Sequence, residues 1–326
     1  MIITQTPLRV SFFGGGTDFP EFFMENGGAI LGTAIDKYIY HSVTPFPSPL
    51  FDYSIRLAYR KVECVRSLDE VEHPAFREVL RFMNIERDVE ISLAADLPSS
   101  SGLGSSSTFT VGLINALLAF KGKFVPQAEL AATAIHIERE ILHNVVGCQD
   151  QVLAAYGGLN VVRFIRPDHF VVHRVSLPKT RQLELDESLL MFFTGITRPA
   201  GEIEKCKLAN LSNIQENLKR MLKLVDEAYG ILTGNQPLSA FGSLLDETWR
   251  EKRMLSPGVT NATIDGIYDK ARAAGALGGK LLGAGGGGFF LLFVPQERQA
   301  AVRNVLSDYF EVPFSINASG SGIIHS

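Results

Sequence analysis

The sequence predicts an α+β protein with two domains. Its 326 residues, 46% of them hydrophobic, can bury a large core, and this length favours two domains over one. The first 65 residues carry short apolar runs broken by glycine, proline and polar turns, the pattern of β-strands. From about residue 185 long helical segments dominate. Because strands and helices are segregated, we expect α+β rather than alternating α/β.

The elements can be placed in chain order. We expect strands at 8–13, 29–35, 38–44 and 55–65, with an antiparallel meander as their simplest arrangement. A short helix near 74–83, a strand at 89–95, helices at 105–121 and 126–143, and strands at 158–164 and 170–175 complete the first half. A strand at 189–194, helices across 202–232, 238–254 and 260–274, a glycine-rich hairpin, and a last helix and strands form the second half. The turn cluster at 175–181 divides domains 1–180 and 181–326.

Composition excludes several classes of protein. The net charge is −4 with both signs interspersed, so we expect no nucleic-acid partner. No apolar run is long enough to span a bilayer, and no cleavage pattern follows the apolar start, so we expect a cytoplasmic protein that does not enter membranes. Three scattered cysteines fit a reducing compartment, and no zinc site is expected.

A serine- and glycine-rich stretch lies between the strand at 89–95 and the helix that follows. Glycines let the backbone fold tightly so that N–H groups point into one concavity, and the helix N-terminus adds a partial positive charge. We therefore expect this stretch to bind the phosphates of a polyphosphate, although an ordinary connection would have a similar composition. The predicted phosphate-binding residues are Pro98, Ser99, Ser100, Ser101, Gly102, Leu103, Gly104, Ser105, Ser106 and Ser107.

Two further segments carry acidic side chains. Asp18 follows three glycines, Gly14 to Gly16, where its carboxylate can accept hydrogen bonds from two vicinal hydroxyls of a sugar; the alternative is a tight turn in which it bonds its own backbone. Glu138 lies on a helix and could reach Mg²⁺ between nucleotide phosphates, since hard cations prefer oxygen ligands. Asp150 could act as a general base.

The segment 278–288 contains too many glycines to be a helix. It precedes an apolar strand, so we expect a pinched hairpin that brings bare backbone against a neighbouring loop or ligand. A packing hairpin without ligand contact is the alternative. It is not a dinucleotide fingerprint, because no acidic residue follows at the expected distance.

Together these elements resemble the GHMP kinase superfamily. Pro7-Leu-Arg9 leading into glycines, the Pro98 to Ser107 loop, Gly147-Cys-Gln-Asp150-Gln and the late Gly283-Ala-Gly-Gly-Gly-Gly288 occur in the order of that family's motifs. The likeness is strongest to the D-glycero-D-manno-heptose 7-phosphate kinases, through Gly14 to Asp18, Ile137-Glu-Arg-Glu140 and Thr194-Gly-Ile-Thr-Arg198. Galactokinases carry Glu-His where this chain has Gly15-Gly16, so galactose is disfavoured as the acceptor.

The resemblance implies a fold and an activity. The expected fold has an N-terminal half like domain 2 of ribosomal protein S5, a ferredoxin-like C-terminal half and an active site in the cleft between them. The implied enzyme is a sugar kinase that moves the γ-phosphoryl group of ATP to the anomeric hydroxyl of D-glycero-D-manno-heptose 7-phosphate, giving the 1,7-bisphosphate for nucleotide-activated heptose and surface polysaccharide. Alternatives are a fucokinase-like or galactokinase-like enzyme, or a non-catalytic relative that binds ATP and sugar.

The same resemblance assigns roles to residues. Asp150 would be the general base, oriented and kept ionised by Arg9, while Ser106 and Glu138 would hold Mg²⁺. No Walker lysine is present, so the metal and arginine must supply the positive charge. The small-molecule partners are ATP and a sugar phosphate, whose far phosphate could meet Arg198 or Lys205, and the sequence leaves a homodimer open. The predicted substrate-binding residues are Gly15, Gly16, Thr17, Asp18, Gln149, Arg198, Gly285 and Gly286.

Overall fold

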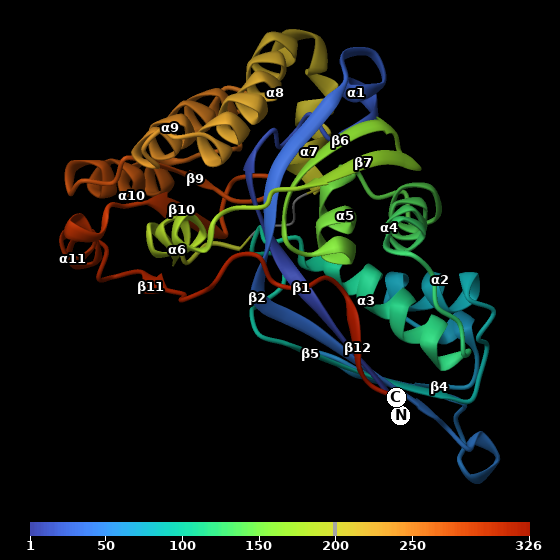
Figure 1. The fold of residues 1–326 in the computed structure, drawn as a ribbon. Helices are drawn as coiled ribbons and strands as arrows, with labels where there is room; N and C mark the ends of the chain where they lie inside the picture. Colours follow the sequence, from blue (N-terminus) through green and yellow to red (C-terminus); the bar gives the residue numbers. More distant parts are fainter. Residues whose placement is uncertain (198–200) are drawn as a thin grey trace.

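The computed structural model describes residues 1–197 and 201–326 and contains two β-sheets flanked by helices (Figure 1). The first sheet has the order β12-β1-β2-β5-β3-β4, with β6 also paired to β2 and β7 paired to β6. The second has the order β11-β8-β10-β9. The first sheet consists of β1 (Ile2–Phe13), β2 (Gly28–Pro45), β3 (Ile55–Ala58), β4 (Val62–Val65), β5 (Val89–Ala95), β6 (Leu159–Arg166), β7 (His169–Arg174) and β12 (Gly322–His325).

The predicted meander is wrong, although its strands are present. The two strands expected at 29–35 and 38–44 form one long strand, β2, which pairs with β1 on one side. Its other side is shared: the first part pairs with β6 and the second part with β5. Because β5 occupies that edge, β3 pairs with β5 instead, in parallel, and the segment expected at 55–65 is a hairpin of β3 and β4.

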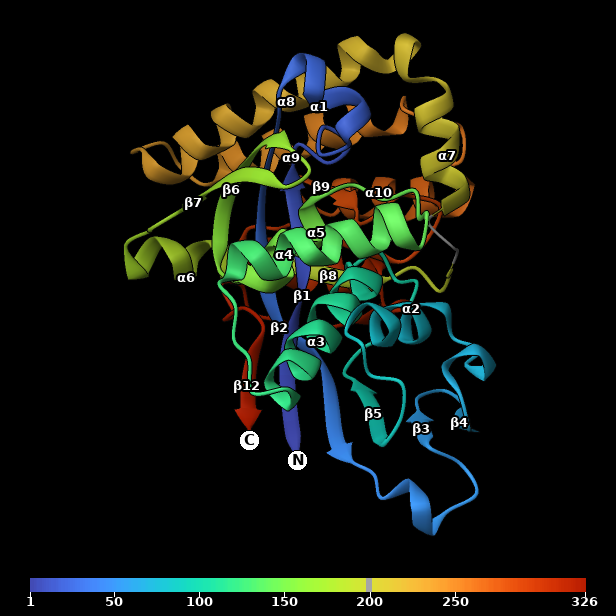
Figure 2. The ribbon, with the colours of Figure 1, turned by 90° about the vertical axis from the view of Figure 1, so that its right-hand side faces the viewer.

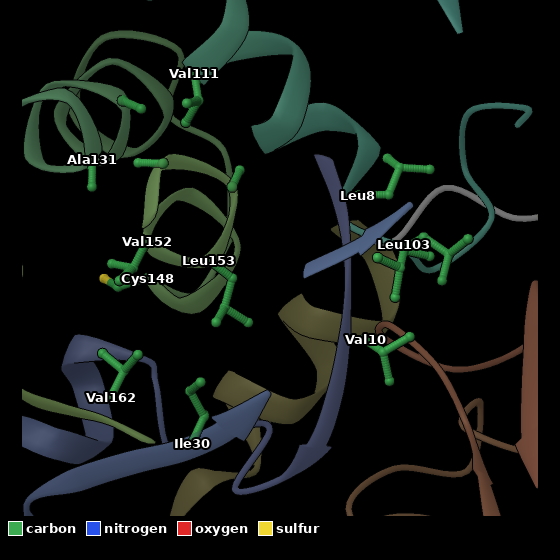
Figure 3. Close-up of a cluster of buried hydrophobic side chains, with 14 of the residues drawn as sticks. Leu8, Val10, Ile30, Leu103, Val111, Ala131, Cys148, Val152, Leu153 and Val162 are labelled. Carbon is green, nitrogen blue, oxygen red and sulfur yellow. The ribbon is translucent and has the colours of Figure 1, made fainter. Parts of the chain in front are cut away.

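Helices cover one face of the first sheet (Figures 1 and 2). The helix α3 is apolar on almost all sides and packs against β1, β2, α4 and α5, which explains why most of its residues are buried. Figure 3 shows the resulting core, with Leu153 of α5 and Val111 of α3 above the strand residues Val10 and Ile30. The elements on this side are α2 (Pro74–Phe82), α3 (Ser105–Phe120), α4 (Gln127–His136), a π-helical turn (Ile137–Ile141) and α5 (Gln149–Tyr156).

The second sheet is buried on both faces. In its strand β10 every residue is buried, as expected for Phe289-Phe-Leu-Leu-Phe293. Phe290 and Leu292 point into a core with Trp249, while Phe289 and Leu291 join the core of the first half. The strands are β8 (Leu189–Phe193), β9 (Gly278–Leu281), β10 (Phe289–Phe293) and β11 (Phe310–Glu311). The helices are α6 (Lys179–Glu187), α7 (Gly201–Ala209), α8 (Leu211–Thr233), α9 (Ser239–Arg253), α10 (Ala262–Ala273) and α11 (Gln296–Val305).

Three further observations complete the description of the fold. The last strand, β12, returns to pair with β1, so both termini lie together at one end of the first sheet (Figure 1). The short helices α1 (Pro20–Asn26) and α6 were not expected, since α1 has seven residues and α6 buries a single residue, Leu185, so neither shows an apolar stripe of helical period. Within the described part of the chain, no helix combines the length and the apolar character needed to cross a bilayer.

Candidate active site

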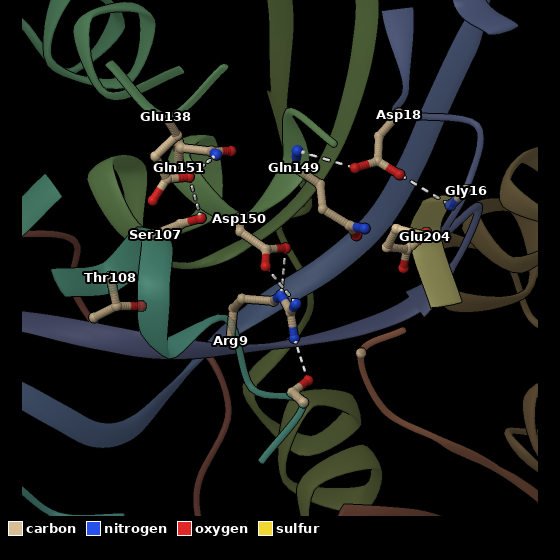
Figure 4. A network of polar contacts seen from close by, with 12 residues as sticks. Arg9, Gly16, Asp18, Ser107, Thr108, Glu138, Gln149, Asp150, Gln151 and Glu204 are labelled. Carbon is tan, nitrogen blue, oxygen red and sulfur yellow. Dashed lines mark hydrogen bonds and ion pairs between the residues drawn. The ribbon is translucent and has the colours of Figure 1, made fainter. Parts of the chain in front are cut away.

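An ion pair between Arg9 and Asp150 lies at the centre of the site (Figure 4). Arg9 is on β1 and Asp150 is in the first turn of α5. The guanidinium contacts both carboxylate oxygens, from Nε to Oδ1 at 2.7 Å and from Nη2 to Oδ2 at 2.6 Å. Its remaining Nη1 donates to the carbonyl of Gly102 at 2.7 Å. A bidentate pair of this kind fixes the orientation of the carboxylate, and it brings Asp150 to the serine-glycine loop.

The serine-glycine loop ends at the N-terminus of α3. Gly104 is the residue that caps this helix, and its φ of 76° lies in the left-handed region that glycine tolerates. A β-carbon on Gly104 would stand 3.1 Å from Arg9 Nε and 3.2 Å from Asp150 Oδ2, so the glycine also makes room for the ion pair. Of the residues that the structure describes, none caps the helix with its side chain, and the first turn holds no acidic residue. The N–H groups of that turn therefore remain free for an anion.

The other predicted loop residues differ in exposure. Pro98, Ser99 and Ser100 are exposed, as is Ser106 in the first turn of α3. Leu103 is fully buried and packs in the core, so it can offer a ligand only its backbone. Ser101 is also buried, and within the described residues its hydroxyl has no hydrogen-bond partner.

Glu138 lies at the junction of α4 and the π-helical turn, and it is fully buried. Its carboxylate accepts hydrogen bonds from the hydroxyls of Ser107 at 2.7 Å and Thr110 at 2.8 Å, and from the amide of Gln151. All three donors are neutral, and burial raises the pKa of Glu138 above its ordinary value. The serine that contacts Glu138 is thus Ser107, and the predicted partner Ser106 is the exposed residue before it.

Asp18 is held between two backbone segments. Its Oδ1 accepts from the N–H of Gly16 at 2.9 Å and its Oδ2 from the N–H of Gln149 at 3.2 Å, so it bonds its own turn and also the start of α5. The side chain is 1% exposed. Burial, and after it the negative charge of Asp150, together raise the pKa of Asp18 to about 6.

Thr17, one of the predicted substrate-binding residues, uses its side chain within the protein. The Thr17 hydroxyl donates to the carbonyls of Gly14 and Ala29, both at 2.8 Å, and it is fully buried. It also accepts from the N–H of Ala29 at 3.2 Å. This hydroxyl ties the turn to β2 and cannot also serve a ligand, which leaves Gly15 and Gly16 as the open positions of the turn.

The glycine-rich segment lies against the serine-glycine loop, which confirms the expected contact of bare backbone with a neighbouring loop. A β-carbon on Gly283 would stand 2.5 Å from the Cα of Gly102, and one on Gly288 would stand 2.3 Å from the carbonyl oxygen of Ser101. The N–H of Phe289 donates to that same carbonyl at 3.1 Å. Gly285 instead faces the backbone of Val259. The last part of the chain therefore fixes the position of the loop.

Three buried lysines near the site escaped the sequence analysis. Lys280 donates to the carbonyls of Ser11 and Phe12, and Lys252 donates to those of Leu281 and Gly283. Burial lowers the pKa of Lys280 to about 7 and holds the pKa of Lys252 well below its usual range. Lys280 stands inside the glycine-rich motif, where a lysine among buried glycines could have been noticed.

The third lysine is on α7, together with an unexpected acidic residue. Lys207 contacts Glu204 at 3.2 Å and the carbonyl of Ala284 at 2.7 Å. In sequence this is an ordinary glutamate–lysine pair three residues apart on a polar helix, which normally faces solvent. Two residues were predicted to bind the distal phosphate of the substrate. Lys205 is exposed, and Arg198 lies outside the described residues.

Comparison with known proteins identifies the family. The family model for the GHMP kinases N terminal domain matches residues 68–158, and the model for the GHMP kinases C terminal domain matches residues 221–312. Over 305 residues the chain is 32% identical to a D-glycero-alpha-D-manno-heptose 7-phosphate kinase of Campylobacter jejuni, covering 90% of this chain and 89% of that protein. The chain belongs to the GHMP kinases. Members of this family use ATP to phosphorylate an alcohol, so this GHMP kinase is a phosphotransferase with an alcohol acceptor.

Two other relatives add detail. The crystal structure of a D-glycero-D-manno-heptose 1-phosphate kinase from Bacteroides thetaiotaomicron superimposes with a TM-score of 0.82 at 25% identity and covers all of both chains. An L-fucokinase/L-fucose-1-P guanylyltransferase of Bacteroides fragilis is 27% identical over 92% of this chain, which spans 35% of that longer protein. The two-domain α+β fold expected of a GHMP kinase is confirmed by the structural match.

Proposed function

We propose that this GHMP sugar kinase transfers the γ-phosphoryl group of ATP to the anomeric hydroxyl of D-glycero-D-manno-heptose 7-phosphate. The observation that carries the proposal is the contact of one arginine, Arg9, with both the carboxylate of Asp150 and the carbonyl of Gly102. This contact brings a candidate base within reach of a phosphate cradle, as phosphoryl transfer requires.

The choice of acceptor comes from the relatives. The names of the Campylobacter and Bacteroides thetaiotaomicron proteins agree on a manno-heptose phosphate, but one names the 7-phosphate and the other the 1-phosphate. We favour the 7-phosphate because that relative is more similar in sequence, at 32% against 25% identity. A free anomeric hydroxyl is then the group to be phosphorylated.

The proposed chemistry needs one base and one electrophile. The proton of the acceptor hydroxyl passes to a carboxylate oxygen of Asp150, and the hydroxyl oxygen bonds to the γ-phosphorus. The bond from that phosphorus to the bridging oxygen breaks, and ADP leaves. Although Arg9 occupies one direction at each carboxylate oxygen, each oxygen can accept a second hydrogen bond. The N–H groups at the start of α3 would stabilise the transferred phosphoryl group.

The site also fits Mg²⁺. Glu138 is a buried carboxylate whose donors among the described residues are all neutral, so a nearby positive charge would stabilise its ionised form. Carboxylate and hydroxyl oxygens are the ligands that Mg²⁺ prefers. Glu138 and Ser106 would hold the ion, with Ser107 orienting the carboxylate. When bound between phosphate groups, Mg²⁺ neutralises charge on their oxygens.

A panel of acceptors tests the proposal. Purified protein is incubated with ATP and Mg²⁺ and with heptose 7-phosphate, heptose 1-phosphate, L-fucose, galactose or mannose. Phosphorus NMR then locates the new phosphate. We expect the highest kcat/KM with heptose 7-phosphate and a product phosphorylated at the anomeric carbon. Preference for fucose or for the 1-phosphate would replace the proposed acceptor, and ATP binding without transfer to any sugar would overturn the assignment.

A further inference from the structure

Helix α7 places an ion pair beside the acceptor site. Lys207 is 9% exposed and Glu204 is 13% exposed, so the pair is largely removed from water. The lysine also donates to the carbonyl of Ala284, which ties α7 to the glycine-rich segment. Only one carboxylate oxygen of Glu204, Oε1, takes part in the pair. The helix is therefore held in place, and no described residue bonds the second oxygen.

That second oxygen is one of three buried polar atoms that lack a partner here. Among the described residues, Glu204 Oε2, Gln149 Oε1 and Ser11 Oγ are all buried without a hydrogen bond. Figure 4 shows Glu204 beneath Gly16, with the Gln149 amide and Asp18 across from it. A β-carbon on Gly15 would lie 3.7 Å from Ser11 Oγ and 3.9 Å from Gln149 Nε2, so both side chains border this glycine. Glu204 lines a small cavity together with the next glycine, Gly16, and its charge acts on Asp18. Native proteins rarely bury polar atoms without partners, so each of these atoms needs a partner such as a ligand or an ordered water.

We propose that Glu204 is a specificity-determining residue that contacts acceptor hydroxyls opposite Asp18. The proposal rests on the proposed function, because it requires a sugar acceptor. Ionised carboxylates accept hydrogen bonds from hydroxyls, but they have no proton to donate to a phosphate oxygen. Asp18 and Glu204 therefore select the hydroxyl-bearing ring of a sugar phosphate and keep its phosphate end out of the space between them. The acceptor is thus oriented by charge before any transfer occurs.

Kinetics of three variants test the contact. Glu204→Ala is expected to raise KM for heptose 7-phosphate about tenfold to a hundredfold, the usual cost of a lost hydrogen bond to a charged group. KM for ATP should change by less than about twofold in the same variant. Glu202→Gln, an exposed position on the same helix, is the matched control and should behave as wild type. An unchanged acceptor KM, or an equal rise in both KM values, overturns the proposal.

The variant Glu204→Gln removes the negative charge of the side chain but keeps its shape, so it is expected to fold as wild type does. At saturating ATP, inorganic phosphate is titrated as an inhibitor competitive with the acceptor. We expect it to bind at least about fivefold more tightly to this variant than to wild type, since one repelling charge is gone. Equal inhibition of both proteins contradicts the charge selection.

A pH profile gives a readout that a purely structural role would not move. Asp18 faces Gly16 and Gln149 backbone N–H groups, the carboxylates of Asp150 and Glu204, the Lys280 ammonium and the Cys148 thiol. Removing the Glu204 charge should move the acidic limb of the 1/KM profile for acceptor to lower pH. If wild type phosphorylates no sugar, the proposed function fails; if it does and the Glu204 variants match it, only this inference fails.

Discussion

Replacing Asp18 with asparagine should remove a pH dependence from the stability of the protein. The pKa of this buried carboxyl rises from an ordinary 3.8 to about 6, first through burial and then through the charge of Asp150. Between these values the folded protein holds the proton more tightly than the unfolded chain does. The free energy of unfolding therefore falls as pH rises from about 4 to 6, and the loss is complete above that. A shift of about two units at 1.4 kcal/mol each corresponds to ~3 kcal/mol.

Urea unfolding from pH 4 to pH 8 measures this effect. Asparagine leaves one of the two backbone N–H groups, that of Gly16 or Gln149, without its acceptor, which costs about 1–3 kcal/mol at every pH. The informative quantity is thus the difference in unfolding free energy between Asp18→Asn and wild type. It should grow by about 2 kcal/mol in favour of the variant from pH 4 to pH 7, because the unfolded carboxyl is already half ionised at pH 4. Asp168→Asn, at a side chain 74% exposed, is the control and should give a flat difference. A flat difference for Asp18→Asn would refute the reasoning.

Three further predictions concern the neighbours of these groups. In Gly147→Ala the new β-carbon would stand 1.9 Å from Asp18 Oδ2, so acceptor KM should rise about tenfold while ATP KM holds; parallel changes in both would contradict this. Glu138→Gln should raise the Mg²⁺ concentration for half-maximal activity by about tenfold, measured by metal titration, and an unchanged titration would exclude a metal role. Gly283→Ala places a β-carbon 2.5 Å from Gly102 Cα, so it should lower Tm and raise ATP KM, at a cost of about 1–3 kcal/mol; wild-type values of both would count against the packing of the two loops.

Much of the fold could be predicted because the local patterns were strong. The strand at 89–95 and the start of the helix at Ser105 are found where the sequence places them. The pairing of strands was not predictable from periodicity, since β2 is long enough to serve β6 and β5 along the same edge. Alternation along a strand reports which face is buried, and it carries no information about which strand lies alongside.

The candidate site divides in the same way. Glycines and serines in one loop predict a phosphate-binding site. In the structure Arg9 and Asp150, which are 141 residues apart in the chain, meet at this loop. Glu204 and Lys207 gave no signal, because a glutamate and lysine three residues apart usually lie on a solvated face. Their burial depends on the glycine-rich segment packing over α7, a tertiary contact that no local pattern contains.

Single-turnover phosphoryl transfer by Asp150→Asn tests the central claim most directly. With ATP, Mg²⁺ and heptose 7-phosphate, the rate of transfer should fall by about 10²–10⁴-fold relative to wild type, the usual cost of losing a general base. ATP affinity, measured by equilibrium titration, should stay within about twofold. A variant that binds ATP normally and transfers phosphate at the wild-type rate would contradict the assignment of Asp150 as the base.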